Sequence, residues 1–475
     1  VTTMDASEEV AQGEEAEYEK TPSKYDRSEP AFGEAPLFVM PEVWKANMDN
    51  GMKVLGIENN ELPLVNFSIS FPGGHSLDPD NKAGLAMLTA DLMNEGTKTK
   101  TSAELEEAIG LLGSSISIRG GLEEINIYGN SLTRNFEETI KLVEEMLLQP
   151  RWDEKEFNRL KQELVTSLKG REANPQAIAS INFNKLIYGD GNMYAVPSEG
   201  TLETANNISL ADVKEFYKHL SPNGATFKVV GNIEKQRVTE ALSSLSEKWK
   251  GEEVTIPSEE ISENNSEGNL YFIDVPNSKQ SVIYAGLPAL SANNDDYTKL
   301  DFANEILGGG SSGRLFQTLR IEKGYTYGAY SYIPSRNETA PFTISTSVRS
   351  NATLPSLEII ENMVKEYGPG FTKEDVELTQ NKVIKQNTRA YESLNAKLGL
   401  LTQIDKYGKP EDYINKEQEL LMNMNMEDFK NIINKYIKEG EMTYVVVGDK
   451  ATQFEEVKKL GKKVIELDIH GNPVK

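Results

Sequence analysis

The chain has 475 residues, a formal net charge of −24 and no cysteine, and these bulk properties exclude several classes of protein. Nucleic-acid binding needs basic patches that oppose the phosphate charge, so the acidic balance argues against DNA or RNA as a partner. No apolar run approaches the ~18 residues of a membrane span, and the lack of cysteine excludes disulfides, thiolate metal ligands and cysteine nucleophiles.

Two polar segments divide the chain. Residues 1–36 hold ten Asp or Glu against three Lys or Arg and lack apolar periodicity, so we expect residues 1–44 to form a flexible acidic arm. A second polar run, residues 252–269, splits the remainder nearly in half and is expected to be a linker. The predicted domains are therefore residues 45–251 and 270–475.

Strands and helices are mixed within each predicted domain. Residues 65–71 (VNFSISF) alternate apolar and polar side chains, as a half-buried strand does, and residues 125–132 and 281–288 are also predicted strands. Thr101 and Glu104 form a capping-box pattern that predicts a helix start. The strands occur in hairpin-like clusters, which favours an α+β fold with mostly antiparallel sheets packed against helices.

The two halves repeat each other in register. WDEKEF at 152 matches FTKEDV at 371, SLADV at 209 matches NMEDF at 425, and KVVGN at 228 matches VVVGD at 445. The spacing stays close to 217 residues across all three pairs, so we predict an internal duplication of a unit of about 217 residues.

The segment KAGLAMLTADLMNEGT, residues 82–97, predicts a helix that is apolar on nearly every face. Thr89 and Asp91 are unexpected in such a helix, because a buried carboxylate needs a partner or a cavity. The three histidines of the chain, His75, His219 and His470, do not pair at metal-ligand spacing and are expected to lie at the surface.

Glycines cluster in the segment GGGSSG. Gly308, Gly310 and Gly313 satisfy G-x-G-x-x-G, but a helical pattern precedes them where a dinucleotide site requires a strand, so nucleotide binding is not expected. Gly308, Gly309 and Gly310 could simply end a helix in a turn. Alternatively, they could form a loop over which a peptide backbone passes without side-chain clashes.

Arg320 and Tyr327 lie seven residues apart, across a predicted helix end at Lys323–Gly324. Bent back over that turn, the guanidinium and the phenol could converge on one carbonyl group, where an Arg grips backbone oxygens and a Tyr hydroxyl donates to an oxyanion. The alternative is an ordinary packed strand with a surface Arg.

Taken together, these segments resemble the inverted-zincin peptidases typified by insulinase, pitrilysin and the mitochondrial processing peptidase. The resemblance runs from about residue 50 to 460 and rests on the repeated unit, GLA…NEGTKTKT, GGGSSGRLFQTLR and GYTYGAYS. In active members the helix after GLA carries H-x-x-E-H, in which two His bind zinc and the Glu is the general base.

The resemblance implies that the zinc site of this chain has been lost. The His positions fall at Met87 and Asp91, the base falls at Ala90, and the third ligand falls at Ser167. No cofactor is therefore expected on this chain, because Asp91 and the nearby Glu95 supply too few ligands for a hard cation. Thr89 and Asp91 are expected to face the former metal cavity.

The second half departs less from the family pattern. The resemblance implies that Arg320 and Tyr327 hold the substrate backbone and the tetrahedral intermediate, with Arg314 and Tyr325 as second choices if the register differs. Some family members are two-chain enzymes, in which zinc lies on one chain, the Arg/Tyr pair lies on the other, and the substrate is an added strand between them.

The expected function is thus that of a non-catalytic subunit of a heterodimeric zinc metallopeptidase. Its partners would be a zinc-bearing homologous subunit and a peptide or unfolded polypeptide. Two alternatives stay open, namely a non-enzymatic peptide-binding or scaffolding protein and an independent peptidase with another metal site. The acidic arm and a first residue other than Met suggest a bacterial periplasmic or cell-envelope location.

Overall fold

The computed structural model describes residues 24–26, 37–189, 191–258 and 268–474. The chain forms two compact units, residues 1–35 and 36–475, and all the helices and strands given below belong to the second unit. Most of the predicted acidic arm and the central part of the predicted linker lie outside the described residues. The described linker residues 252–258 contain no helix or strand. The domain boundaries stay predictions.

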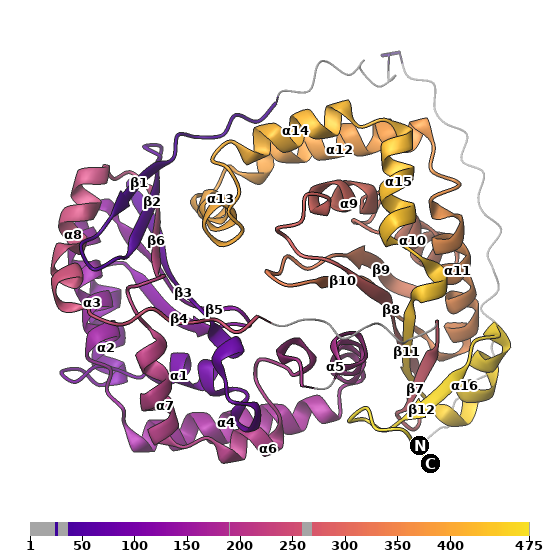
Figure 1. Ribbon diagram of the computed structural model, residues 1–475, viewed down its shortest axis with the longest axis horizontal. Coiled ribbons are helices and arrows are strands. Elements are labelled where there is room, and N and C mark those ends of the chain that lie inside the picture. The colour runs from indigo at the N-terminus through magenta and orange to yellow at the C-terminus, as the bar shows by residue number, and fades with distance from the viewer. Residues whose placement is uncertain (1–23, 27–36, 190, 259–267, 475) are drawn as a thin grey trace. The chain divides into compact units, whose positions relative to one another are not determined.

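Two six-stranded mixed sheets organise the second unit (Figure 1). The first sheet has the order β1-β2-β6-β3-β5-β4 and the second has the order β12-β7-β11-β8-β10-β9. The strands are β1 (Trp44–Asn47), β2 (Lys53–Glu58), β3 (Leu64–Pro72), β4 (Ser115–Gly120), β5 (Glu124–Leu132), β6 (Thr226–Gly231), β7 (Leu270–Asp274), β8 (Gln280–Leu290), β9 (Thr326–Tyr332), β10 (Ala340–Arg349), β11 (Thr443–Gly448) and β12 (Val464–Leu467).

Helices flank both sheets. Those of the N-terminal half are α1 (Leu85–Met93), α2 (Ser102–Leu111), α3 (Phe136–Leu148), α4 (Glu154–Glu172), α5 (Pro175–Tyr188), α6 (Leu202–Asn207), α7 (Leu210–Phe216) and α8 (Lys235–Lys248). Those of the C-terminal half are α9 (Tyr297–Asn304), α10 (Arg314–Phe316), α11 (Thr353–Tyr367), α12 (Lys373–Ala390), α13 (Leu394–Lys406), α14 (Tyr413–Asn423), α15 (Met426–Tyr436) and α16 (Lys450–Val457). The predicted α+β class is confirmed. No helix in these described stretches is long and apolar enough to cross a membrane.

The two halves share one strand order. β2, β6, β3, β5 and β4 occupy the same successive positions as β7, β11, β8, β10 and β9, and β1 and β12 differ as outer strands. Most pairings are antiparallel, with parallel pairing at β2–β6, β7–β11 and β7–β12. The duplication stays a prediction, and this shared order supports it.

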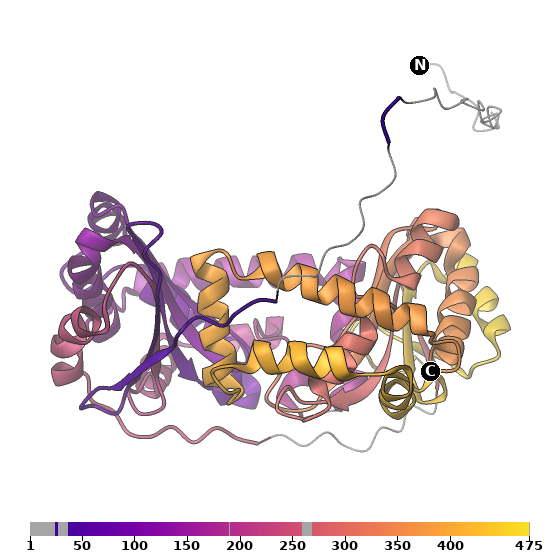
Figure 2. The same ribbon diagram turned by 90° about the horizontal axis from the view of Figure 1, so that it is seen from above.

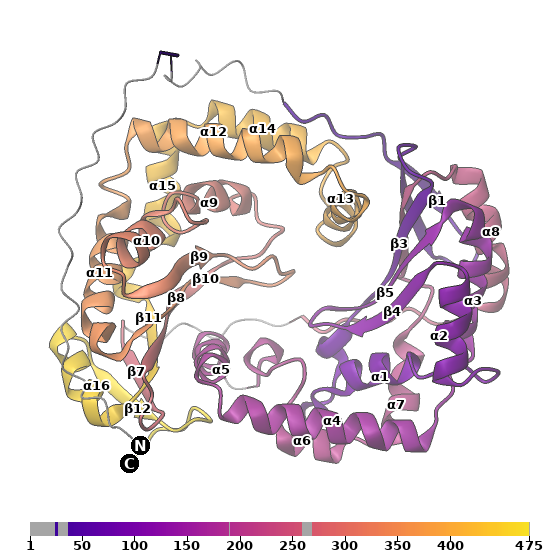
Figure 3. The same ribbon diagram turned by 180° about the vertical axis from the view of Figure 1, so that it is seen from behind.

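Each sheet is covered on one side by helices of its own half and on the other by a helix of the opposite half. α5 packs on β8 and β11, and α13 packs on β3 and β6 (Figures 1 and 3). Seen from above, orange helices of the C-terminal half reach the indigo N-terminal sheet (Figure 2). β6 and β11 are consequently buried along their whole length, in keeping with their mostly apolar sequences, in which Lys228 of β6 is the one charged residue.

A buried ion pair fixes α13 on the N-terminal sheet. Lys228 of β6 is fully buried, and its Nζ lies 2.9 Å from Oδ2 of Asp405 and also donates to the hydroxyl of Ser70. The other oxygen of Asp405 accepts a 2.8 Å hydrogen bond from Thr226. The pair is surrounded by apolar residues of β2, β6 and α13, so its two charges depend on each other.

Candidate functional site

α1 begins at a residue that only glycine occupies easily. Gly84 precedes the helix with φ 99°. The carboxylate of Asp78 accepts hydrogen bonds from the backbone N–H groups of Gly84 and Ala86, both at 2.8 Å. Burial raises the pKa of Asp78 above its usual value, although these bonds and His75 oppose the shift. Asp78 therefore satisfies backbone donors that the first turn of α1 leaves free.

The prediction that His75 is a surface residue is wrong. His75 is buried, its Nδ1 lies 2.8 Å from the Asp78 carboxylate, and its Nε2 lies 3.2 Å from the carbonyl oxygen of Met193. The PGGH turn directs the ring inward because Gly73 and Gly74 take positive φ angles, and this turn geometry is not evident from the sequence spacing.

Thr89 and Asp91 do not share a cavity, contrary to expectation. Thr89 is fully buried and its hydroxyl donates to the carbonyl of Leu85 within the helix, whereas Asp91 is exposed. Residues two positions apart on an α-helix differ by about 200° around its axis, so the side chains at 89 and 91 point to nearly opposite sides. Thr89 is thus a core residue, and only Asp91 faces solvent.

Asp91 lies in an acidic cluster between α1 and α4. Partial removal of water by the surrounding protein raises the pKa of Asp91 to about 6, and the nearby carboxylates of Glu95 and Glu163 add to the shift. Arg159 of α4 joins the cluster, since its guanidinium lies 2.7 Å from Glu95 and 2.8 Å from Glu163. A guanidinium therefore neutralises carboxylates next to the position at which the family pattern places a metal ligand.

The four residues at the positions where the family resemblance places the zinc ligands and the base differ in their exposure. Met87 is half-buried, Ala90 is buried, Asp91 is exposed on α1, and Ser167 is exposed on α4. Within the described parts of the chain, no group of three or more His, Cys, Asp or Glu residues is arranged to hold a metal ion.

Arg320 and Tyr327 lie next to each other. Arg320 belongs to a π-helical turn at Gln317–Glu322, and Tyr327 is the second residue of β9. The Cζ atom of Arg320 lies 5.2 Å from the centre of the Tyr327 ring, and its Nη1 donates a long, 3.4 Å hydrogen bond to the carbonyl of Thr326. Tyr327 is 82% exposed, so its hydroxyl is open to a ligand.

The second choices for this pair have structural surroundings. Arg314 lies 2.7 Å from Asp375 and over the ring of Tyr367, which ties α10 to α12 and α11. Tyr325 is half-buried and packs against the C-terminal core. Neither is as exposed as Tyr327, so Arg320 and Tyr327 are the better candidates for contact with a ligand.

The glycine loop packs tightly against β9. Gly308 is buried, its carbonyl accepts a 3.1 Å hydrogen bond from the N–H of Ser331, and a Cβ at this position would come 2.4 Å from the same nitrogen. A Cβ on Gly309 would come 2.7 Å from the backbone of Glu305. Gly310 has φ 153°. The close approach at Gly308 explains why this position requires glycine.

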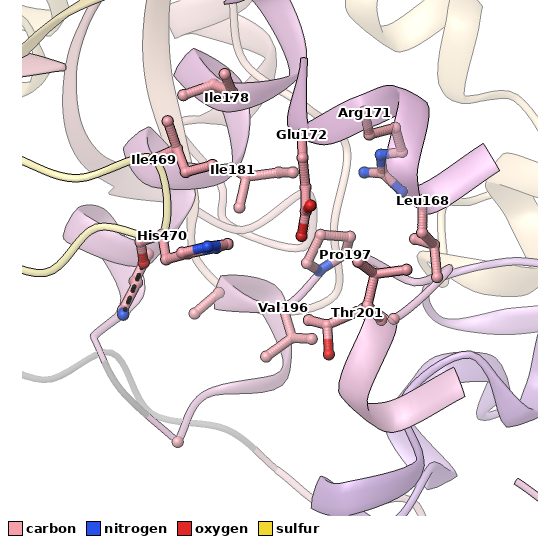
Figure 4. Close-up of a pocket in the computed structure, with 15 residues that line it drawn as sticks. Leu168, Arg171, Glu172, Ile178, Ile181, Val196, Pro197, Thr201, Ile469 and His470 are labelled. Carbon is pink, nitrogen blue, oxygen red and sulfur yellow. Dashed lines mark hydrogen bonds between the residues drawn. The ribbon is translucent and has the colours of Figure 1, made fainter. Parts of the chain in front are cut away.

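A separate pocket of about 320 Å³ lies between α4, α5, the loop before α6 and the C-terminal tail (Figure 4). Its wall is mostly apolar, with Arg171, Glu172, Lys185 and His470 as charged or titratable members. Arg171 is engaged in an ion pair with Glu199 at 3.0 Å. The pocket includes none of the site residues predicted from the sequence.

Comparison with known proteins identifies the family. Residues 53–193 match the insulinase (peptidase family M16) domain, and residues 207–383 match the peptidase M16 inactive domain. The non-peptidase homolog YmxG of Helicobacter pylori is 23% identical over 402 residues, which cover 83% of this chain and 91% of that protein. The uncharacterized zinc protease YmxG of Bacillus subtilis is 22% identical, with 74% of this chain and 84% of that protein covered.

Solved structures agree with this assignment at the level of the fold. The peptidase M16 inactive domain from Pseudomonas fluorescens superposes with a TM-score of 0.80 at 24% identity, covering 86% of this chain and 98% of that one. A Helicobacter pylori protease superposes with a TM-score of 0.77 at 17% identity, covering 86% and 100%. This chain therefore belongs to the insulinase family, peptidase family M16.

Proposed function

We propose that this chain is the non-catalytic subunit of a two-chain M16 peptidase. In this role it binds a peptide or unfolded polypeptide and presents Arg320 and Tyr327 to a bond that is cut at the zinc of a homologous partner. The observation that carries the proposal is that the exposed Arg320–Tyr327 pair persists in a chain whose H-x-x-E-H positions hold Met87, Ala90 and Asp91.

Two further findings support a role without catalysis on this chain. One similar protein, from Helicobacter pylori, is named a non-peptidase homolog, and one matched domain is described as inactive. Arg320 and Tyr327 can stabilise a tetrahedral intermediate without a metal of their own, because a guanidinium and a phenol both donate hydrogen bonds to a developing oxyanion.

The test begins with the partner. Affinity purification of the tagged chain from its native source should bring down, in near-equal amount, a homologous chain with an intact H-x-x-E-H helix. With that complex, Tyr327→Phe and Arg320→Ala should each reduce peptide hydrolysis by on the order of 10²-fold, as the loss of one oxyanion donor does. Tyr330→Phe, on the same strand, is the matched control and should hydrolyse normally. Unchanged hydrolysis in both site variants would refute the catalytic contribution.

A non-enzymatic peptide-binding or scaffolding role is the second candidate. It is favoured by similarity to human cytochrome b-c1 complex subunit 1, a component of a larger assembly, which is 20% identical over 45% of this chain and 44% of that protein. Under this alternative, no zinc-bearing homologue would copurify with the chain, and the isolated protein would still bind polypeptide.

A further inference from the structure

The edge of the N-terminal sheet carries an amide side chain where a peptide strand would pair. Asn94 directly follows α1, and its Oδ1 accepts a hydrogen bond from the N–H of Ile118 while its Nδ2 donates to the carbonyl of Ile118, both at 2.9 Å. These are the two bonds that a residue of a neighbouring strand would make. The same Nδ2 also donates to the carbonyl of Ala90 at 3.0 Å, which holds the side chain in place.

The position of Ile118 makes this contact decisive for β4. β4 is an outer strand with β5 as its strand neighbour, and backbone groups along an antiparallel strand alternate between the two sides. The backbone N–H and carbonyl groups of Ile118 point away from β5. By the same alternation, those of Ile116 and Gly120 also point away from β5. Any two successive pairing positions on the open edge of β4 therefore include Ile118, whose N–H and carbonyl are already occupied.

The outer strand of the C-terminal sheet, β9, also has one residue whose backbone groups are occupied, but this residue lies near the end of the strand. The N–H of Ser331 in β9 donates to Gly308, and its carbonyl accepts a 2.8 Å hydrogen bond from Asn304. Ser331 pairs with Ile344, as Ile118 pairs with Ile127, so the two occupied residues are equivalent in their sheets. Ser331 is the penultimate residue of its strand, whereas Ile118 lies within β4.

The remaining part of β9 lies beside the predicted ligand-binding pair, and its pairing with β10 shifts register between Ala329 and Thr326. Ala329 faces the same side as Ser331, and among the described residues no backbone hydrogen bond from outside the sheet is recorded at Ala329. Thr326 offers its carbonyl to Arg320 through the long 3.4 Å bond. A strand added here would end at the Gly308 loop and would pass Arg320 and Tyr327.

We propose that Asn94 closes β4 to strand addition and that a bound polypeptide pairs instead with residues 326–329 of β9. This inference rests on the proposed function, since it assumes that the chain binds polypeptide. Asn94 is then a specificity-determining residue, because it selects which of the two sheets receives the ligand strand, and the Gly308 loop sets where that strand stops.

The absence of cysteine from the sequence allows a direct test. A single cysteine introduced as Arg119→Cys on β4 or as Tyr330→Cys on β9 is labelled with benzophenone maleimide, and each full-length protein is irradiated with fluorescein-labelled β-casein, an unfolded polypeptide. We expect at least fivefold more cross-linked casein from Tyr330→Cys than from Arg119→Cys. Adding Asn94→Ala should raise cross-linking at Arg119→Cys to a similar level.

Two controls separate the possible failures. Asn304→Ala frees the carbonyl of Ser331 and should leave cross-linking at Arg119→Cys unchanged. Fluorescence polarisation with the same casein measures binding independently of position. If casein binds and, with Asn94 intact, cross-links to Arg119→Cys as strongly as to Tyr330→Cys or more strongly, this inference alone is overturned. If casein binds to no variant, the proposed polypeptide binding is overturned as well. The comparison with Asn94 intact decides the matter even if Asn94→Ala fails to fold.

Discussion

Replacing Asp405 by asparagine should destabilise the protein strongly, because it leaves a buried lysine without its counter-charge. Lys228 is 0% exposed and Asp405 is 14% exposed, so little water is available to solvate the lysine once the carboxylate is gone. Removal of one partner from such a pair costs about 3–5 kcal/mol. Lys228→Met should cost less, because it removes the fully buried charge, and the Asp405 carboxylate that it leaves is partly exposed and still hydrogen-bonded to Thr226.

Urea unfolding can measure this difference. The three tryptophans, Trp44, Trp152 and Trp249, all lie in the N-terminal half, so their fluorescence reports on the half that α13 covers. Hydrogen exchange followed by mass spectrometry then shows whether α13 opens. Glu138→Gln is the control, since Glu138 forms an exposed pair with Lys141 that contributes only about 0–1 kcal/mol. If Asp405→Asn unfolds within about 1 kcal/mol of this control, the lysine does not depend on Asp405 and the reasoning is refuted.

Four further substitutions test other parts of the fold. Gly308→Ala should lower the free energy of unfolding by about 1–3 kcal/mol, because its methyl group would press against Ser331. Gly399→Ala, in an open part of α13, should raise the free energy of unfolding by about 0.5–1 kcal/mol. Thermal unfolding of both variants distinguishes close packing at Gly308 from a general effect of replacing glycine. The pKa of Asp91 in the folded protein is raised to about 6, so its contribution to stability falls as pH rises from about 4 to 6. Asp91→Asn should remove this fall, which unfolding free energies measured across that pH range would show. Equal slopes for Asp91→Asn and the unmodified protein would mean that the shift is absent. Thr101→Ala should cost about 1 kcal/mol through the lost helix cap, visible as a lower urea midpoint.

Features that depend on a few neighbouring residues could be predicted from the sequence. The capping box at Thr101 is confirmed, and the aligned segments SLADV and NMEDF each begin a helix with a capping box, at Ser209 and Asn425. The strands expected at 65–71 and 281–288 are present as parts of β3 and β8. In each case the pattern and the structure it specifies lie within the same short window.

Features that depend on contacts between distant segments could not be predicted in this way. The amide of Asn94 meets Ile118 across the α1–β4 contact, and no periodicity in either segment indicates that they pair. The sequence allows two interpretations of Gly308, because the residue that requires a glycine there is Ser331, in a strand more than twenty residues later. The conformations of Gly73 and Gly74, which carry His75 into the interior, are a backbone property that composition does not reveal.

The exchange of α5 and α13 between the halves has a consequence for synthesis of the chain on the ribosome. When β6 has been made, the N-terminal sheet has all its strands, yet the face that α13 covers stays open until residue 406 has been added. At about 5–20 residues per second, this interval lasts roughly 9–35 s. During that time the nascent chain displays Leu55, Ile57 and Val230 beside an unpaired Lys228. The first half therefore exposes an apolar face with an uncompensated charge until the second half supplies the helix that covers it.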